Sequence, residues 1–364
     1  MRVKLEDVCE RGTSSLMQKD IVDKNGKYPV YGASGRIGSM ETYQQEHQTV
    51  AVVKDGAGIG RTMLLPEKSS VIGTMQYLIP KNCIESEYLY YVVKYMHLEK
   101  YSSGATIPHI YFRDYKTEEF NLHDKTEQRE IVSTLKRIEA IISNRQEQLT
   151  KLDELIKARF VEMFGDPSDN TEGWPILSLN DIIATIESGW SGNGKQRKKA
   201  PGEIAVLKVS AVTKGYFIPT ECKVLDNQSN IKKYVFPQKG DLLFSRANTR
   251  EMVGATALIN QDYPELILPD KLWKIRFSEN VDVVYMKYIL SSKTIRDSFS
   301  AASTGTSGSM YNVSMEKFRS IVVPVPPLSL QNQFADFVEE VDKSKLLAEL
   351  FAQNACILAE NRSK

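Results

Sequence analysis

The sequence predicts an α+β protein with a pseudo-two-fold repeat: two similar mixed α/β domains separated by two long antiparallel coiled-coil helices. Three observations predict it. One segment recurs later in the chain at a constant offset, both copies follow β-branched and aromatic runs typical of strands, and both lead into apolar residues spaced four and three apart. With 364 residues, 41% of them hydrophobic, the chain can bury at least two cores.

The repeat is clearest ahead of each long helix. Residues 104–140 read GATIPHIYFRDYKTEEFNLHDKTEQREIVSTLKRIEA, and residues 305–341 read GTSGSMYNVSMEKFRSIVVPVPPLSLQNQFADFVEEV. From His109 and Asn312 onward the two copies align at a constant offset, which pairs Tyr115 with Phe318, Gln128 with Gln331 and Ile138 with Val341. Upstream, residues 87–96 resemble residues 284–293, and both read as short amphipathic helices.

Strand signals fill both globular parts of the chain. Five runs are β-branched or aromatic and are ended by Gly, Pro, Asn or Asp: QTVAVVKDGAG, MQYLIP, IAVLKVSAV, KGDLLFSRA and KLWKIRF. Each globular part is therefore expected to be a curved, mixed α/β domain.

The first long helix carries a coiled-coil seam. Its apolar seam residues alternate in spacing between four and three, and they are Ile131, Leu135, Ile138, Ile142, Leu149, Leu152, Ile156 and Met163. Arg145 and Arg159 occupy two further seam positions. The helix is expected to end at FGDP, where Gly165 can cap it and Pro167 forbids continuation. From Gln128 to Phe164 it would be roughly 55 Å long at about 1.5 Å per residue.

The second long helix has smaller seam residues. They are Phe334, Val338, Val341, Lys345, Ala348, Ala352, Ala355 and Ala359. Small residues suit close packing against a partner helix, so antiparallel pairing with the first long helix is expected. The predicted boundaries are a first domain over 1–123, a central helix over 124–167, a second domain over 168–327 and a C-terminal helix over 328–364.

Charge is unevenly distributed although the net charge is only +1. Residues 174–325 hold 20 basic and 14 acidic side chains, whereas residues 1–123 hold 15 of each. The second domain is therefore the more positive one, as a DNA-binding domain would be. No long apolar run or signal-like N-terminus occurs, so a soluble cytoplasmic protein with no membrane partner is expected.

Catalytic and metal-binding motifs are weak or missing. The four cysteines lie far apart, which argues against a zinc site or a disulfide framework. GWSGNGKQ has Gln196 where a phosphate-binding loop needs Ser or Thr, and DGAGIGR has Arg61 where a dinucleotide-binding loop needs its third glycine. Adenine methylation needs an Asn-Pro-Pro-aromatic loop, which the sequence lacks. A chain with no catalytic residues, no metal site and no cofactor of its own is expected.

Several phrases resemble the specificity subunits of type I restriction-modification enzymes. They are KYPVYGASGRIGSME, VAVVKDGAGIGRTMLL, EQREIVSTLKRIEAIISNRQEQLTKLDELIKARFVEMFGDP, VLKVSAVTKG, GDLLFSRANT and PVPPLSLQNQF. The resemblance covers essentially the whole chain, and the central helix with its FGDP end is its most specific part. One departure is that the last residue aligns with Val161 at the repeat offset, so EMFGDP has no second copy.

The resemblance implies a non-catalytic subunit with two target-recognition domains, each of which reads one half of a split, asymmetric DNA target. The helices would set the spacer between the halves. Double-stranded DNA, two methyltransferase subunits and restriction and translocase subunits would be its partners. S-adenosylmethionine, ATP and Mg²⁺ would be bound by those partner subunits.

Candidate DNA contacts combine donor side chains with exposed turns. In the second domain they are Lys195, Arg197, Lys198 and Lys199 in a Gly-rich loop, and Ser245, Arg246, Asn248 and Arg250 after a strand. In the first domain they are Arg36, Arg61, Thr106 and His109. Each set has a plainer interpretation as a solvated loop or hairpin turn. A specificity subunit for a fused nuclease-methylase partner, a scaffold without DNA affinity and a nucleotide-binding enzyme are the alternative functions.

Overall fold

The computed structural model describes residues 1–21, 26–104, 107–227, 231–304 and 311–363, with side chains described as far as residue 351. The chain divides into two compact units, which are described here one at a time. Unit 1 comprises Met1–Leu149 and Leu347–Lys364, and unit 2 comprises Thr150–Leu346. Each long helix contributes one part to each unit.

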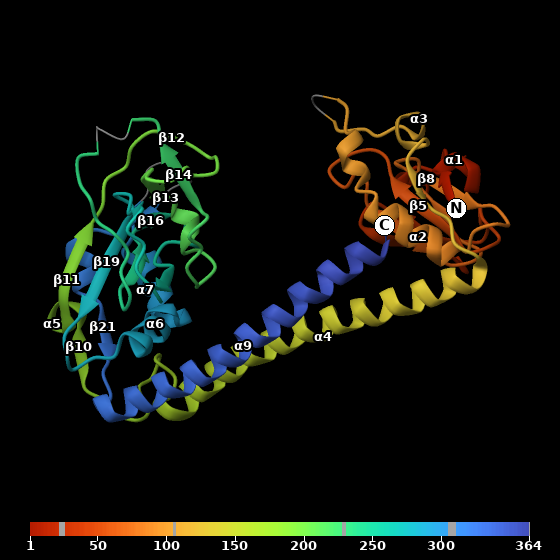
Figure 1. Ribbon diagram of the computed structural model, residues 1–364. Coiled ribbons are helices and arrows are strands. Elements are labelled where there is room, and N and C mark those ends of the chain that lie inside the picture. The colour runs from red at the N-terminus through yellow and green to blue at the C-terminus, as the bar shows by residue number, and fades with distance from the viewer. Residues whose placement is uncertain (22–25, 105–106, 228–230, 305–310, 364) are drawn as a thin grey trace. The chain divides into compact units, whose positions relative to one another are not determined.

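Unit 1 is built on an antiparallel sheet with strand order β2-β8-β5-β6 and on a second sheet with order β4-β3-β7. The strands and their bounds are β1 (Arg2–Lys4), β2 (Cys9–Thr13), β3 (Tyr28–Gly32), β4 (Gly35–Met40), β5 (Thr49–Val53), β6 (Thr62–Leu65), β7 (Ser70–Val71), β8 (Met75–Pro80) and β9 (Glu119–Asn121). Helical elements are α1 (Leu5–Val8), η1 (Gln18–Asp20), α2 (Ser86–Tyr95), η2 (Leu98–Tyr101) and α3 (Phe112–Tyr115). Helix α2 packs against β5, β6 and β8 (Figure 1).

Unit 2 has the same plan. Its sheets have the orders β11-β19-β15-β17 and β12-β14-β13-β18. Its strands are β10 (Ile176–Ser178), β11 (Ile183–Ser188), β12 (Gly194–Lys195), β13 (Ala205–Leu207), β14 (Cys222–Leu225), β15 (Leu242–Ser245), β16 (Ala247–Asn248), β17 (Thr256–Leu258), β18 (Leu266–Ile267), β19 (Leu272–Phe277), β20 (Tyr311–Asn312) and β21 (Val322–Pro324). Its helical elements are α5 (Leu179–Ile182), η3 (Val209–Ala211), α6 (Val283–Ser291), α7 (Lys293–Ala302) and α8 (Met315–Arg319).

The pairing patterns confirm the repeat that the sequence predicts. Strands β2-β8-β5-β6 of unit 1 correspond to β11-β19-β15-β17 of unit 2, and the parallel pair β3 and β7 corresponds to β13 and β18. The predicted run MQYLIP is β8, and KLWKIRF contains β19. The two predicted short helices are α2 and α6. The predicted α+β class with two similar mixed domains is confirmed.

The long helices are α4 (Lys125–Phe164) and α9 (Leu328–Ser363). Helix α4 begins where the Asp124 carboxylate accepts hydrogen bonds from the backbone N–H groups of Thr126 and Glu127, at 2.8 and 2.9 Å. It ends at Gly165, whose φ of +76° is the left-handed conformation that a glycine cap adopts. The predicted stop at FGDP is therefore confirmed.

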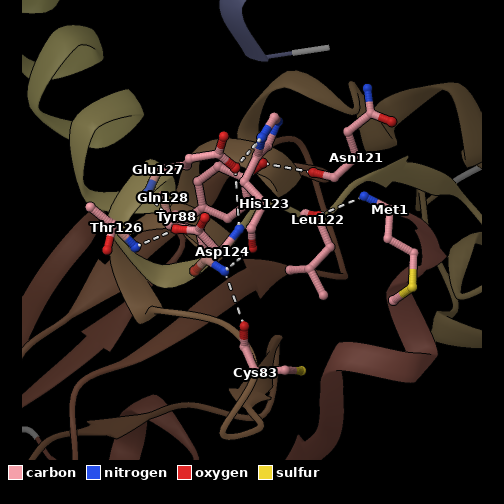
Figure 2. Close-up of polar contacts among 10 residues, drawn as sticks. All are labelled: Met1, Cys83, Tyr88, Asn121, Leu122, His123, Asp124, Thr126, Glu127 and Gln128. Carbon is pink, nitrogen blue, oxygen red and sulfur yellow. Dashed lines mark hydrogen bonds and ion pairs between the residues drawn. The ribbon is translucent and has the colours of Figure 1, made fainter.

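A buried glutamine joins each long helix to its domain. Gln128, which Figure 2 shows beside Cys83 and His123, donates from Nε2 to the carbonyl oxygens of both residues at 3.0 and 2.9 Å. Its Oε1 accepts from the backbone N–H of Glu85 at 2.8 Å. Gln331 repeats two of these three bonds in unit 2: its Oε1 accepts from the backbone N–H of Asp282 at 2.8 Å, and its Nε2 donates to the carbonyl oxygen of Pro326 at 2.7 Å. Both glutamines are fully buried, so the identity at the repeat offset reflects a shared structural role.

As far as residue 351, the predicted seam lies on the less exposed face of both helices, and the seam positions Ala352, Ala355 and Ala359 lie beyond the described side chains. In unit 1, Leu135 is buried and Ile131 and Ile138 pack against the same core. In unit 2, the seam residues of α4 and α9 share one core, formed by Leu152, Ile156, Phe334, Val338 and Val341. Ile142 and Leu149 are half-buried. The seam prediction missed Phe160 and Phe164, which are among the most buried residues of α4.

Contacts along the helices run in opposite directions, which confirms antiparallel pairing. Within unit 2, the ring of Phe164 lies 5.5 Å from that of Phe334, and the Lys345 ammonium lies 2.7 Å from the Asp153 carboxylate. Each seam arginine contacts a phenylalanine ring of α9. Within unit 1 the Arg145 guanidinium lies 5.4 Å from the ring of Phe351, and within unit 2 the Arg159 guanidinium lies 5.9 Å from the ring of Phe337, so both charges make cation–π contacts.

Candidate nucleic-acid interface

One edge recurs in both units and carries several of the candidate contacts. In unit 1 it is formed by the loop between β5 and β6 and by residues 107–113, and in unit 2 by the loop between β15 and β17 and by residues 311–313. We call these the unit 1 edge and the unit 2 edge. Hydrogen bonds place them in equivalent positions: the N–H of Ile110 donates to the Lys54 carbonyl at 2.9 Å, as Val313 does to Arg246 at 2.9 Å.

The loops of both edges close in the same way. Gly60 donates its N–H to the Val53 carbonyl at 2.9 Å, and Gly254 donates to the Ser245 carbonyl at 2.8 Å. Both glycines have a φ of +81°, which disfavours any other residue. The shared backbone geometry therefore presents different side chains at matching places.

The unit 1 edge holds a hydrogen-bonded histidine and aspartate. Nδ1 of His109 lies 2.7 Å from Oδ1 of Asp55, and the Lys54 ammonium lies 3.3 Å from Oδ2. The His109 ring also stacks on the Tyr111 ring, with ring centroids 6.3 Å apart. The Tyr111 ring makes a second contact with the Arg113 guanidinium, which lies 4.8 Å from its centroid. Exposed aromatic and cationic groups of this kind can contact bases and phosphates.

The unit 2 edge carries hydrogen-bond donors instead. Arg246 rests over the Trp273 ring at 5.8 Å and donates from Nε to the Asp270 carbonyl at 3.1 Å, which leaves its terminal nitrogens available for a second partner. Asn248 is half-buried, and its Nδ2 is a buried atom with no hydrogen-bond partner within the described residues, so this donor is not accessible from the surface in this conformation. Arg250 is exposed and donates weakly, at 3.4 Å, to the Ser300 hydroxyl.

Ser245 does not lie on the surface. It is the last residue of β15, all of whose side chains are buried, and its own exposure is 0%. Its hydroxyl is therefore inaccessible to DNA in this conformation, in contrast to the contact that the sequence suggests. Thr106, another predicted contact, lies outside the described residues.

Arg36 and Arg61 each lie at the hairpin between β3 and β4. Arg36 is exposed on β4, and Arg61 donates from Nη1 to the carbonyl of Ala33 in the hairpin turn at 2.6 Å. The exposed guanidinium of Arg61 therefore has a fixed position next to that turn.

The basic loop of unit 2 is partly neutralised by its own carboxylates. Arg197 makes a bidentate ion pair with Glu203, at 2.6 and 2.8 Å, and these hydrogen bonds lower the pKa of Glu203 to about 2. The Lys199 ammonium lies 3.0 Å from the Glu265 carboxylate and lowers the pKa of that group. Lys195 and Lys198 are exposed. These two lysines are thus the more available cations of the loop.

Sequence reasoning missed several residues of the two edges. Lys54, Asp55, Tyr111 and Arg113 of the unit 1 edge were not among the candidates, nor was Asn312, which pairs with Ala247 in unit 2. The repeat offset could have identified Asn312, because it aligns with the candidate residue His109. Nothing in the sequence brings Asp55 next to His109.

Neither a metal-binding group nor a membrane-spanning helix occurs in the part of the chain that the structure describes. No group of three or more His, Cys, Asp or Glu side chains there is placed to hold a metal ion. No helix within those residues combines the length and the apolar character needed to cross a bilayer.

Comparisons with known sequences point to one family. The sequence model of the type I restriction modification DNA specificity domain matches residues 1–153 and 171–352. The specificity subunit of the type I restriction enzyme EcoEI of Escherichia coli is 27% identical over 216 residues, which are 57% of this chain and 35% of that subunit. The EcoKI specificity subunit of Escherichia coli strain K12 is 24% identical over 255 residues, 66% of this chain and 54% of that subunit. The matches thus span about a third to a half of these relatives.

Solved structures show the same fold. The S subunit of a type I restriction-modification system from M. genitalium aligns with a TM-score of 0.57 at 16% identity and covers 100% of this chain and 95% of its own. A chain from a study of complex assembly and conformational transition in the type I system aligns with a TM-score of 0.55 at 15% identity, covering 100% and 96%. Together with the family match over both repeats, these likenesses show that the chain belongs to the type I restriction-modification DNA specificity family.

Proposed function

We propose that this chain is the DNA-reading subunit of a type I restriction-modification complex and recognises a bipartite, asymmetric target. One observation carries the proposal: the two units repeat one backbone framework but present different hydrogen-bonding groups at its equivalent edge. Unit 1 presents Asp55 and His109, whereas unit 2 presents the guanidinium groups of Arg246 and Arg250. Two similar domains with different chemistry suit two different half-sites.

The chain itself would perform no chemistry in this proposal. Two methyltransferase subunits would dock on the helices and domains and would bind S-adenosylmethionine for transfer to adenine N6. Restriction and translocase subunits would bind ATP and Mg²⁺ and join the same assembly. The named relatives are specificity subunits of type I enzymes, which favours this assembly over one with a fused nuclease-methylase.

The long helices would set the unspecified spacer between the half-sites. Helix α4 is continuous over 40 residues, about 60 Å at roughly 1.5 Å per residue, and it contributes to both units. A continuous helix fixes a distance more tightly than a flexible linker of the same number of residues.

The experiment is reconstitution of the chain with the methyltransferase encoded beside it, followed by DNA binding to a random duplex library. We expect selective retention of duplexes with two short defined blocks at a fixed separation, and an affinity that falls steeply as salt rises. Retention without sequence preference, or no retention at low salt, would contradict the proposal and favour a scaffold without DNA affinity.

A further inference from the structure

We infer that Asp55 is a specificity-determining residue of the first domain and that its carboxylate accepts a hydrogen bond from an exocyclic amino group in the major groove. The base would be a cytosine or an adenine, since both present such an amino group there. This inference rests on the proposed function and names the chemistry of one half-site.

The first argument is that Asp55 is held in place. Its backbone N–H donates to the Thr74 carbonyl at 3.3 Å, and the next residue, Gly56, donates to the Pro108 carbonyl at 2.9 Å. Its side chain receives the His109 hydrogen bond at 2.7 Å. Because a carboxylate only accepts, the proton of this hydrogen bond is on Nδ1 of His109. A side chain held by one hydrogen bond, on a backbone held by two others, loses little conformational entropy when it contacts a base.

The second argument is that Asp55 keeps unused acceptor capacity. A carboxylate offers about four lone-pair sites, and His109 occupies one of them on Oδ1. The Lys54 ammonium lies 3.3 Å from Oδ2, longer than an ordinary charged hydrogen bond of about 2.7–2.9 Å. The Asp55 side chain is 28% exposed, so a ligand can reach it.

The third argument is that the surface beside Asp55 is open. Gly56 has a φ of +92°, and a Cβ added there would meet no described atom within 4 Å. The neighbouring Tyr111 and Arg113 are exposed, and the Tyr111 ring contacts both His109 and Arg113. Lys54 and Arg113 can neutralise phosphates, which would offset the repulsion between DNA and the carboxylate.

The fourth argument is the contrast with unit 2. There the position of Asp55 is taken by Ala247, which is 1% exposed and has no polar side chain, and Arg246 takes the position of Lys54. The unit 1 edge therefore offers a carboxylate acceptor at a place where the unit 2 edge offers no side-chain hydrogen-bonding group. This difference at equivalent places predicts half-sites that differ in the base read there.

The experiment measures binding of the complex, assembled with its methyltransferase, to duplexes that carry the mapped target. In the first half-site, each cytosine is replaced in turn by a pyrimidinone without the N4 amino group, and each adenine by purine, which lacks the N6 amino group. We expect one replacement to weaken binding about 5- to 150-fold, and its identity distinguishes cytosine from adenine.

The same replacement should have little further effect on the Asp55→Ala complex, because the acceptor is already missing. If both complexes lose the same factor at every position, the inference is overturned. Methylation mapping adds a second measure that needs only folded protein in cells: Asp55→Asn should change the preferred base at one position of one half-site. An unchanged motif, or a change in the other half-site, would also overturn it.

Two further variants separate specificity from folding. Glu119→Gln removes a surface carboxylate of the same unit, which is paired with Arg2 at 2.8 Å on β9, and should leave the motif unchanged. His109→Gln removes the ring that holds Asp55 and should relax preference at the same position as Asp55→Asn. A wild-type complex that methylates no split motif would defeat the proposed function itself, whereas a split motif insensitive to Asp55 would defeat only this inference.

Discussion

Replacing Gln331 with alanine should destabilise unit 2 by about 2–5 kcal/mol. The side chain is fully buried, accepts from the Asp282 N–H at 2.8 Å and donates to the Pro326 carbonyl at 2.7 Å. Alanine leaves both backbone groups without that partner, at about 1–3 kcal/mol for each buried unsatisfied group, and it adds a small cavity.

Tryptophan fluorescence during denaturant unfolding measures this loss selectively. The three tryptophans of the chain, Trp174, Trp190 and Trp273, all belong to unit 2. The matched control is Gln333→Ala, because Gln333 is exposed on the same helix and alanine favours helix; its effect should stay within about 0.5 kcal/mol. A loss below about 1 kcal/mol for Gln331→Ala would refute the assigned role of the buried hydrogen bonds.

Three further predictions concern the helices and the basic loop. Phe160→Ala should cost about 3–5 kcal/mol in the same fluorescence assay because Phe160 is buried, whereas the exposed Val161→Ala should cost little; equal losses would contradict the assigned core. Glu203→Gln should free Arg197 and steepen the salt dependence of DNA binding by about one counterion; an unchanged salt dependence would show that Arg197 does not contact phosphate. Inserting four residues at Arg145 adds about 6 Å of helix and should lengthen the methylated spacer by about two base pairs with both half-sites kept; an unchanged spacer in methylation mapping would refute the spacer role.

Local patterns were enough to predict the helices and several strands. The four-three spacing of α4 lies on its buried face because helical geometry returns those positions to one side. Gly165 ends the helix because a positive φ suits glycine, and the run MQYLIP is a strand because its residues fit a pleated, buried surface. These features depend on neighbours in the chain.

The edges depended on contacts that no local pattern contains. Asp55 and His109 are far apart in sequence and meet only because residues 108–110 pack against the backbone that follows β5. Ser245 looked accessible because it precedes Arg246, yet β15 lies between two other strands and its side chains are buried on both faces. Burial on two faces depends on sheet order, which the sequence did not reveal.

The most direct test of two reading domains is methylation mapping of the wild-type complex beside Asp55→Asn and Arg246→Ala. Arg246 is the guanidinium at the unit 2 edge that corresponds in position to Lys54. The account predicts that each variant alters base preference in a different half of one split motif and that the spacer stays constant. It would be contradicted if both variants altered the same half, or if neither changed a motif that still depends on this chain.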